Sequence, residues 1–401
     1  MATGDQAATV LSSDAAGDML STAVATAHQT LESWRLDAVH ARPGAETSAT
    51  YDVTVSGERQ YLVASTVSLT EDERAAVKAV RLESDLGVVH VWRHPSDPRL
   101  PGLADACVPV ALADRLARVG IGEATVEQLE MLVLRPMRRA VLRANVSSHG
   151  LSGRIYIKVL RPDAARQVLA RHAACGLAPK AYDAGDGIVV IEGAAGRPLT
   201  EYLYRPDAPR YLDPAVLVAA LDSVGPGAME MDRRRSAADL IDTYTEAAVK
   251  TGADEARLEA VRTAIHALTD GAGDLGPLVP THGDFHAANV FVDGGDDARV
   301  TALIDLDTLG PGYRVDDLAC MLAHLHTLPT FDEHGYRDVP GLIRDATADF
   351  SRRVPPAQLR ARAAAVLVSL MGGAEHEGRR DRWLAIAEHL VAEARQMRVL
   401  S

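Results

Sequence analysis

Residues 280–293 read PTHGDFHAANVFVD, and a second apolar run farther along ends in LIDLD at residues 303–307. Asp284 and Asn289 precede the short run VFV, Asp305 closes the run VTALID, and GGDD between the runs is a hairpin turn signal. A short turn brings the ends of two paired strands side by side. The sequence therefore predicts that these two carboxylates and one amide converge on a single site.

The residue types at this site favour phosphoryl transfer. Carboxylate and amide oxygens suit Mg²⁺, a hard cation that prefers oxygen ligands and keeps waters which phosphate oxygens can share. Phosphoryl transfer requires little more than metal ions, a lysine on the phosphates and an acidic group that orients the nucleophile.

Global composition bounds the class of protein. The chain has 401 residues, of which 47% are hydrophobic, so it is globular and long enough for two or three domains. Its net charge of −13 argues against a nucleic-acid partner, because phosphate binding needs concentrated Lys and Arg. The three cysteines, Cys107, Cys175 and Cys320, are widely spaced, which indicates reduced thiols in a cytoplasm.

The N-terminal segment has neither the basic region nor the apolar region of a secretory signal. No apolar run approaches about 18 residues, so no membrane span is expected. We therefore expect a cytoplasmic protein without a membrane partner. The oligomeric state stays open.

The N-terminal part of the chain reads as a separate unit of unknown role. Residues 1–20 are small and polar and are expected to lack order. The segments YDVTVSG and ERQYLVAST (51–66) predict a hairpin, EDERAAVKAVRLES (71–84) a helix, and LGVVHVWRH (86–94) a strand.

The rest of the chain predicts two lobes. Three β-rich runs, a helix that begins near Pro162 and a strand at GIVVIEG (187–193) predict a small, mostly antiparallel lobe. Beyond residue 197 the apolar spacing is mainly helical. The expected fold class is α+β, with an N-terminal extension at 1–125, a small lobe at 126–195 and a helical lobe at 196–401.

Three spaced elements carry a resemblance to a known family: HGDFHAANVFV (282–292), LIDLD (303–307) and GYRVDDLA (312–319). Their order resembles the HGDxxxxN, hydrophobic strand, IDxx and D-L-A pattern of the aminoglycoside phosphotransferase and choline kinase family. These are small-molecule kinases with a protein-kinase-like fold. The resemblance covers roughly residues 126–401 and implies a bilobal kinase-like fold.

The resemblance also implies roles for single residues. Asp284 matches the catalytic aspartate that orients or deprotonates the acceptor hydroxyl, and His282 matches the histidine that braces the catalytic loop. Asp317 matches an aspartate with a structural role behind that loop, with a helix N-cap as the other interpretation. The metal ligands implied are Asn289, Asp305 and Asp307.

The small lobe is implied to bind ATP. Lys158 in RIYIKVLRP matches the phosphate-binding lysine; the alternative is a surface lysine on an edge strand. Met137 replaces the glycine of a P-G-R-R turn, so Arg138 or Arg139 is expected to meet the phosphates in place of a backbone cradle; the alternative is a solvated hairpin. The hinge residues expected to receive the adenine include Glu192 and Ala194.

Two observations on the lysine oppose each other. Only four of the 42 basic residues are Lys, so Lys158 stands out in a chain that uses Arg by default. A kinase also expects a carboxylate on the following helix to hold this lysine. Here PDAARQVLARHAACG contains no Glu, and the sequence does not say what replaces it.

The leading hypothesis is an ATP- and Mg²⁺-dependent kinase for a small-molecule hydroxyl, with an aminoglycoside, an amino sugar, a sugar or an amino alcohol as acceptor. A Ser or Thr of a peptide is another acceptor class, and a degenerate kinase-like binding module is an alternative that the missing Glu motivates. H-x-D-x-H at 282–286 leaves a metallohydrolase as a third interpretation. Acidic residues that would favour a polyamine acceptor are Glu201, Asp239, Asp242 and Glu246.

Overall fold

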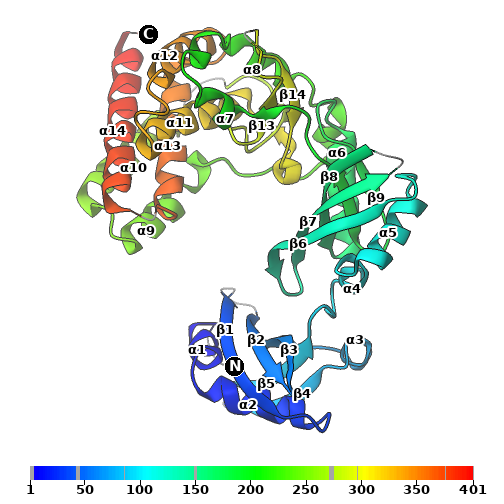
Figure 1. Cartoon of the computed structure of the whole chain (residues 1–401). Helices are drawn as coiled ribbons and strands as arrows, with labels where there is room; N and C mark the ends of the chain where they lie inside the picture. Colours follow the sequence, from blue (N-terminus) through cyan, green and yellow to red (C-terminus); the bar gives the residue numbers. More distant parts are fainter. Residues whose placement is uncertain are drawn as a thin grey trace. The chain divides into compact units, whose positions relative to one another are not determined.

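The computed structural model describes residues 4–41, 46–84, 86–148, 151–270, 275–295, 297–374 and 376–400. The chain divides into two compact units. The first comprises Met1–Leu169 with Lys180–Gly193, and the second comprises Ala170–Pro179 with Ala194–Ser401. Figure 1 shows that the first unit is built mainly on sheets and the second mainly on helices, as an α+β fold requires.

The first unit begins with a five-stranded antiparallel sheet in the order β1-β2-β3-β5-β4. Two helices cover one face of this sheet, and their apolar residues share its core (Figure 1). The Tyr51 hydroxyl also donates a hydrogen bond to the Leu11 carbonyl, at 2.6 Å. The elements are α1 (Gly4–Leu11), α2 (Ala15–Ala25), β1 (Leu31–Ala41), β2 (Thr47–Val55), β3 (Glu58–Ser65), β4 (Val80–Ser84) and β5 (Gly87–Arg93).

Two expectations for this region are wrong. Residues 4–20 are largely helical, because Leu11 and Leu20 are buried against the sheet. The helix expected over 71–84 stops at Ala76 as α3 (Glu71–Ala76), which Thr70 caps. The rest of that segment pairs with β5 as the strand β4, so the strand partner overrides the acidic helical pattern.

A second antiparallel sheet, in the order β6-β7-β8-β10-β9, completes the first unit. The helices α4 and α5 pack on one face of this sheet and α6 packs on the other. The observed order agrees with the predicted β-β-β-α-β pattern and adds the short strand β9. The elements are α4 (Leu103–Ala106), α5 (Pro109–Arg118), β6 (Thr125–Arg135), β7 (Arg139–Ser148), β8 (Leu151–Leu160), α6 (Pro162–Ala173), β9 (Ala181–Asp183) and β10 (Ile188–Glu192).

The turn between β6 and β7 joins the two sheets of the first unit. Met137 in this turn has a positive φ of 62° and is only 2% exposed. Its backbone N–H donates to Asp97 Oδ2 at 2.8 Å. Its side chain therefore serves as an apolar anchor at the position where the related P-G-R-R turn has a glycine. The residues packed with it are Val63, Val67, Val77 and Trp92.

Truncation of Met137 should loosen this junction. We expect Met137→Ala to lower the free energy of unfolding of the first unit by about 2–4 kcal/mol, because a buried methionine leaves a cavity. Met137→Gly removes the same side chain but tolerates the positive φ, so it should be less destabilising than Ala by up to about 1 kcal/mol. Urea unfolding of the full chain measures both values, and a loss below about 0.5 kcal/mol in both variants would contradict the anchor.

The second unit is a helical body with two small sheets. Helix α13 contacts α9, α10, α11 and α14, which lie around it in Figure 1. The helices are α7 (Leu199–Leu203), α8 (Pro214–Leu221), α9 (Ile241–Lys250), α10 (Glu255–Thr269), α11 (Arg314–Phe331), α12 (Val339–Phe350), α13 (Pro356–Met371) and α14 (Glu377–Leu400). The strands are β11 (Arg197–Pro198), β12 (Val279–Thr281), β13 (Val290–Val292), β14 (Val300–Leu303) and β15 (Gly310–Gly312).

None of the helices in the described part of the chain combines the length and the apolar character that crossing a membrane requires.

Candidate active site

The hairpin of β13 and β14 positions the residues that the sequence singled out. Val290 pairs with Leu303 across the hairpin, and the Ile304 N–H donates to the Asn289 carbonyl at 3.0 Å. Asn289 and Asp305 therefore lie at the same end of the hairpin. Asp305 has the left-handed conformation (φ 57°, ψ 56°), which Asp and Asn tolerate better than most residues.

Asp284 lies in the loop between β12 and β13. The Asn289 side-chain amide donates to the Asp284 carbonyl at 2.9 Å and lies 3.1 Å from His286 Nε2. The Asp284 carboxylate is 38% exposed and lies 3.8 Å from the same His286 nitrogen. Burial lowers the pKa of His286, while the nearby carboxylates of Asp284 and Asp305 act in the opposite direction. The structure thus brings both carboxylates close to one imidazole.

His282 braces the loop from inside the protein. Its side chain is buried, its Nε2 donates to the Ile304 carbonyl at 3.0 Å, and its Nδ1 accepts the Asp284 N–H at 3.3 Å. Burial lowers the pKa of His282 to about 4, so the ring is neutral at pH 7. Because both ring nitrogens are engaged, His282 is poorly placed as the metal ligand that a metallohydrolase would need. No group of three or more His, Cys, Asp or Glu residues able to hold a metal occurs among the residues that the structure describes.

Asp317 holds the same loop from helix α11. It is 1% exposed, and its two carboxylate oxygens accept the backbone N–H groups of His282 (2.9 Å) and Gly283 (2.8 Å). Burial raises the pKa of Asp317 to about 7, although both donors favour the ionised form. Gly283 has φ 79°, and a Cβ there would lie 2.5 Å from the Thr308 carbonyl oxygen. The loop therefore needs glycine at this position and a buried acceptor beneath it.

His324 is a site residue that the sequence did not single out for a kinase. Its ring stacks on that of His286, with centroids 4.2 Å apart and planes 14° from parallel. Burial lowers the pKa of His324 to about 3, so it is neutral at pH 7. It comes from a helix whose pattern reads only as amphipathic, and no short motif marks it.

His326, two residues after His324 on α11, makes the stability of the second unit depend on pH. Burial lowers its pKa to about 4, against about 6.5 for an unfolded chain. The unfolded state therefore takes up the proton first as the pH falls. The stability due to neutral His326 is fully present above about pH 6.5 and is lost between about pH 6.5 and 4.

Replacing His326 with Leu removes this titration. We expect a shallower decline of unfolding free energy between about pH 6.5 and 4.5, by up to about 3 kcal/mol over that window. Urea unfolding at several pH values tests it, with His376→Leu, at an exposed position before α14, as the control. An equal decline in wild type and His326→Leu would contradict the assignment.

Oxygen donors at the end of the hairpin fit a magnesium ion. Because Asn289 Nδ2 donates to the Asp284 carbonyl, Oδ1 is the atom that would serve as a metal ligand, with the usual assignment of amide atoms. The Asp305 carboxylate is exposed, and Asp307 lies half-buried in the 3₁₀ turn Leu306–Thr308. This donor set suits Mg²⁺ in preference to a soft metal.

The residues expected to bind nucleotide are mostly in the first unit. Lys158 lies on β8, the central strand of its sheet, between Val141 and Val189, so it is not on an edge strand. Arg138 directly follows the buried Met137 in the β6–β7 turn. The hinge position Glu192 donates its N–H to the Lys180 carbonyl (2.9 Å) and accepts the Tyr182 hydroxyl (2.6 Å). Ala194 follows as the first residue of the second unit's main segment.

The acidic residues expected at an acceptor site do not surround Asp284. The cavity beside Asp284 has a volume of about 120 Å³ and is lined by none of these four carboxylates: Glu201, Asp239, Asp242 and Glu246. Asp242 instead pairs with Arg262 (2.8 Å) and His266 (2.9 Å). The polyamine expectation that rested on these residues is therefore not supported by their positions.

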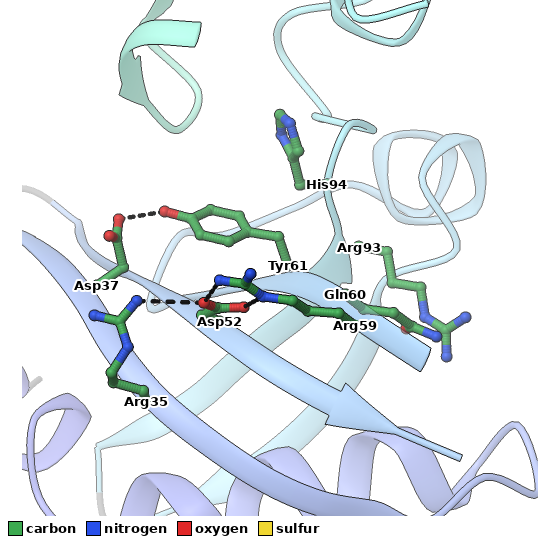
Figure 2. Close-up of a pocket in the computed structure, with 8 residues that line it drawn as sticks. All are labelled: Arg35, Asp37, Asp52, Arg59, Gln60, Tyr61, Arg93 and His94. Carbon is green, nitrogen blue, oxygen red and sulfur yellow. Dashed lines mark hydrogen bonds and ion pairs between the residues drawn. The ribbon is translucent and has the colours of Figure 1, made fainter. Parts of the chain in front are cut away.

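A separate polar pocket of about 670 Å³ lies on the sheet of the N-terminal region (Figure 2). Asp52 in this pocket binds Arg35 (3.2 Å) and also Arg59, and the Tyr61 hydroxyl points to Asp37 (Figure 2). Its charges therefore largely satisfy one another.

A family model described as "Phosphotransferase enzyme family" matches residues 158–353. No curated protein sequence matches the chain.

Several solved structures are similar to part of the chain. A thermostable mutant of an aminoglycoside phosphotransferase, solved with ADP and hygromycin B, is 14% identical, with a TM-score of 0.46 over 71% of this chain and 98% of that chain. Choline kinase LicA from Streptococcus pneumoniae is 15% identical, with a TM-score of 0.42 over 70% and 98%. An ethanolamine kinase from Plasmodium vivax is 12% identical, with a TM-score of 0.37 over 66% and 82%. All three TM-scores are below 0.5, so no residue correspondence is drawn from them.

Proposed function

We propose that the chain transfers the γ-phosphoryl group of ATP to a hydroxyl of a small molecule, a reaction that its match to the phosphotransferase enzyme family model over residues 158–353 supports. The observation that supports this best is the loop 282–289. Its catalytic carboxylate is half-exposed, while the groups that fix the loop are buried beneath it. A rigid loop that presents one accessible carboxylate is suited to orienting an acceptor hydroxyl.

In the proposed reaction, Asp284 accepts the proton of the acceptor hydroxyl. The acceptor oxygen forms a bond to the γ-phosphorus, the bond between that phosphorus and the β,γ-bridging oxygen breaks, and ADP leaves. His282 and Asp317 hold the backbone N–H groups of residues 282–284, which lead into Asp284, and take no part in the proton transfer.

Asn289 and Asp305, with Asp307 as a further candidate, would hold Mg²⁺, which offsets phosphate charge when it is bound. Lys158 and Arg138 are proposed to meet the phosphates, and the backbone around Glu192 and Ala194 to meet the adenine.

A coupled ADP-release assay with Mg²⁺-ATP and a panel of aminoglycosides, amino sugars, sugars and amino alcohols tests the proposal. We expect acceptor-dependent ADP release that stops when EDTA removes the metal. ATP binding without release for any acceptor would favour a peptide acceptor or the degenerate binding module, and a Ser/Thr peptide library separates these two. Absence of ATP binding by calorimetry would reject the kinase.

A further inference from the structure

The cavity beside Asp284 is formed entirely within the second unit. Asp284 and Gly283 form one wall, α11 and α13 form two more, and residues 234–238 with Tyr244 close the remainder. A molecule in this cavity lies against the proposed catalytic carboxylate. The charges on its walls therefore select the acceptor.

Two carboxylates line the cavity, Asp284 and Asp316. Asp316 already forms an ion pair with Arg362. Arg362 Nη1 lies 2.6 Å from Asp316 Oδ1 and also contacts Ser236 Oγ at 3.3 Å. The Arg362 side chain is 7% exposed, so this is a largely buried ion pair between α11 and α13. Arg362 therefore offsets the charge of Asp316, which weakens its attraction for an ammonium group.

The other ionisable groups in the lining add no negative charge. Burial lowers the pKa of His324 and raises the pKa of the Cys320 thiol, so both are neutral at pH 7. Arg234 and Arg235 are exposed and line the same cavity.

Arginines outnumber carboxylates in the lining of the cavity. The lining holds three arginines, Arg234, Arg235 and Arg362, and two carboxylates, Asp284 and Asp316. Two further carboxylates act on lining residues from outside the cavity and are already engaged: Asp239 accepts the Ser236 N–H at 2.9 Å, and the buried Asp317 accepts two backbone N–H groups. A polycation would thus meet more positive than negative charge, whereas an anion would meet guanidinium donors suited to carboxylate and phosphate oxygens.

We propose that the acceptor taken by this cavity is a hydroxyl compound that also carries a carboxylate or phosphate group, recognised by Arg234 and Arg235, and that polyamines are poor acceptors. The inference rests on the proposed kinase function, since it names the substrate class of the same site. It differs from that proposal in its test, because it concerns the charge of the acceptor and not whether transfer occurs.

Two sets of acceptors matched in size but not in charge provide the test: glucuronate, glucose and glucosamine, and glycerate, glycerol and serinol. ADP release is measured for each with Mg²⁺-ATP, and glucose 6-phosphate and kanamycin extend the range of charge. We expect kcat/KM for the anionic member of at least one set to exceed that of its amino counterpart by about tenfold or more, which corresponds to about 1.4 kcal/mol.

Variants tie the preference to the cavity. Arg234→Glu combined with Arg235→Glu should lower the ratio of anionic to cationic kcat/KM by about tenfold or more. The control is Arg344→Glu, an exposed arginine on α12 outside the lining, which should leave the ratio unchanged.

The outcomes separate the two proposals. Preferred turnover of glucosamine, serinol or kanamycin would overturn the acceptor class while leaving the kinase intact. If ATP binds but no compound reacts, ligand-observed NMR with ADP present measures binding of the same sets. Binding of the anionic members above their amino counterparts would support the inference, and equal, reversed or absent binding would overturn it. Failure to bind ATP at all would remove the kinase proposal itself.

Discussion

Replacing Asp284 with Asn is expected to lower kcat for acceptor-dependent ADP release by about 10²–10⁴-fold, the usual loss when a general base is removed. The amide has the same shape but cannot take the hydroxyl proton. The fold should survive, because the carboxylate is 38% exposed and lies 3.8 Å from His286 Nε2, too far for a hydrogen bond. The backbone contacts of residue 284 to His282 and Asn289 do not involve the carboxylate.

A matched control lies on the same hairpin. Asp293 is an exposed turn aspartate whose Oδ1 accepts the Arg299 N–H at 3.2 Å, so Asp293→Asn removes an equal charge without touching the loop at Asp284. It should keep kcat within about twofold. The assay uses the best acceptor from the panel, and calorimetry with ATP should give similar affinities for all three proteins. An Asp284→Asn variant with more than half of the wild-type kcat would exclude Asp284 as the base.

The hairpin that carries Asn289 and Asp305 could be predicted because it forms from residues that are close together in the sequence. Asn289 and Asp305 are separated by two short strands and one turn, so pairing alone places them at one end. The strand that carries Lys158 could be predicted equally well, because the apolar residues around it alternate, and the structure places Lys158 on β8. In both cases a local sequence pattern encodes the local structure.

The charge of the acceptor cavity could not be predicted in this way. Its arginines come from an irregular segment (234–235) and from the middle of α13 (Arg362), far apart in the sequence. Acidic residues on α9 seemed equally suited to the cavity, and only tertiary packing shows that Asp242 instead pairs with Arg262. The sequence of a helix does not indicate which cavity each of its side chains will line.

The first 20 residues illustrate a different limit. They contain few large apolar residues, and propensity alone did not justify a helix there. Leu11 and Leu20 nevertheless become fully buried because a sheet built later in the chain offers an apolar face. Local composition therefore underestimates order wherever a distant strand supplies the missing surface.

Asp317→Ala should combine a loss of stability with a loss of rate. The methyl group leaves the His282 N–H without its acceptor inside the protein, which costs about 1–3 kcal/mol. The Gly283 N–H adds less, because Gly283 is exposed and water can replace the carboxylate there. We expect a total loss of about 2–3 kcal/mol in unfolding free energy. The variant no longer has to bury a carboxylate, and this gain reduces the loss of stability. The gain does not cancel the loss, because the buried His282 N–H is left without a partner.

The rate should fall because the loop that presents Asp284 loses its support on one side. We expect kcat to decrease about 10–100-fold at a temperature where the variant is fully folded, with little change in ATP affinity, since misplacement by about 1 Å can cost 10²-fold. Asp317→Asn, which keeps the volume and one acceptor oxygen, should recover part of both losses. Asp345→Ala, at an exposed position on α12, is the control for removal of a carboxylate. A destabilised Asp317→Ala with wild-type kcat would show that the buried carboxylate supports the fold but does not position the loop.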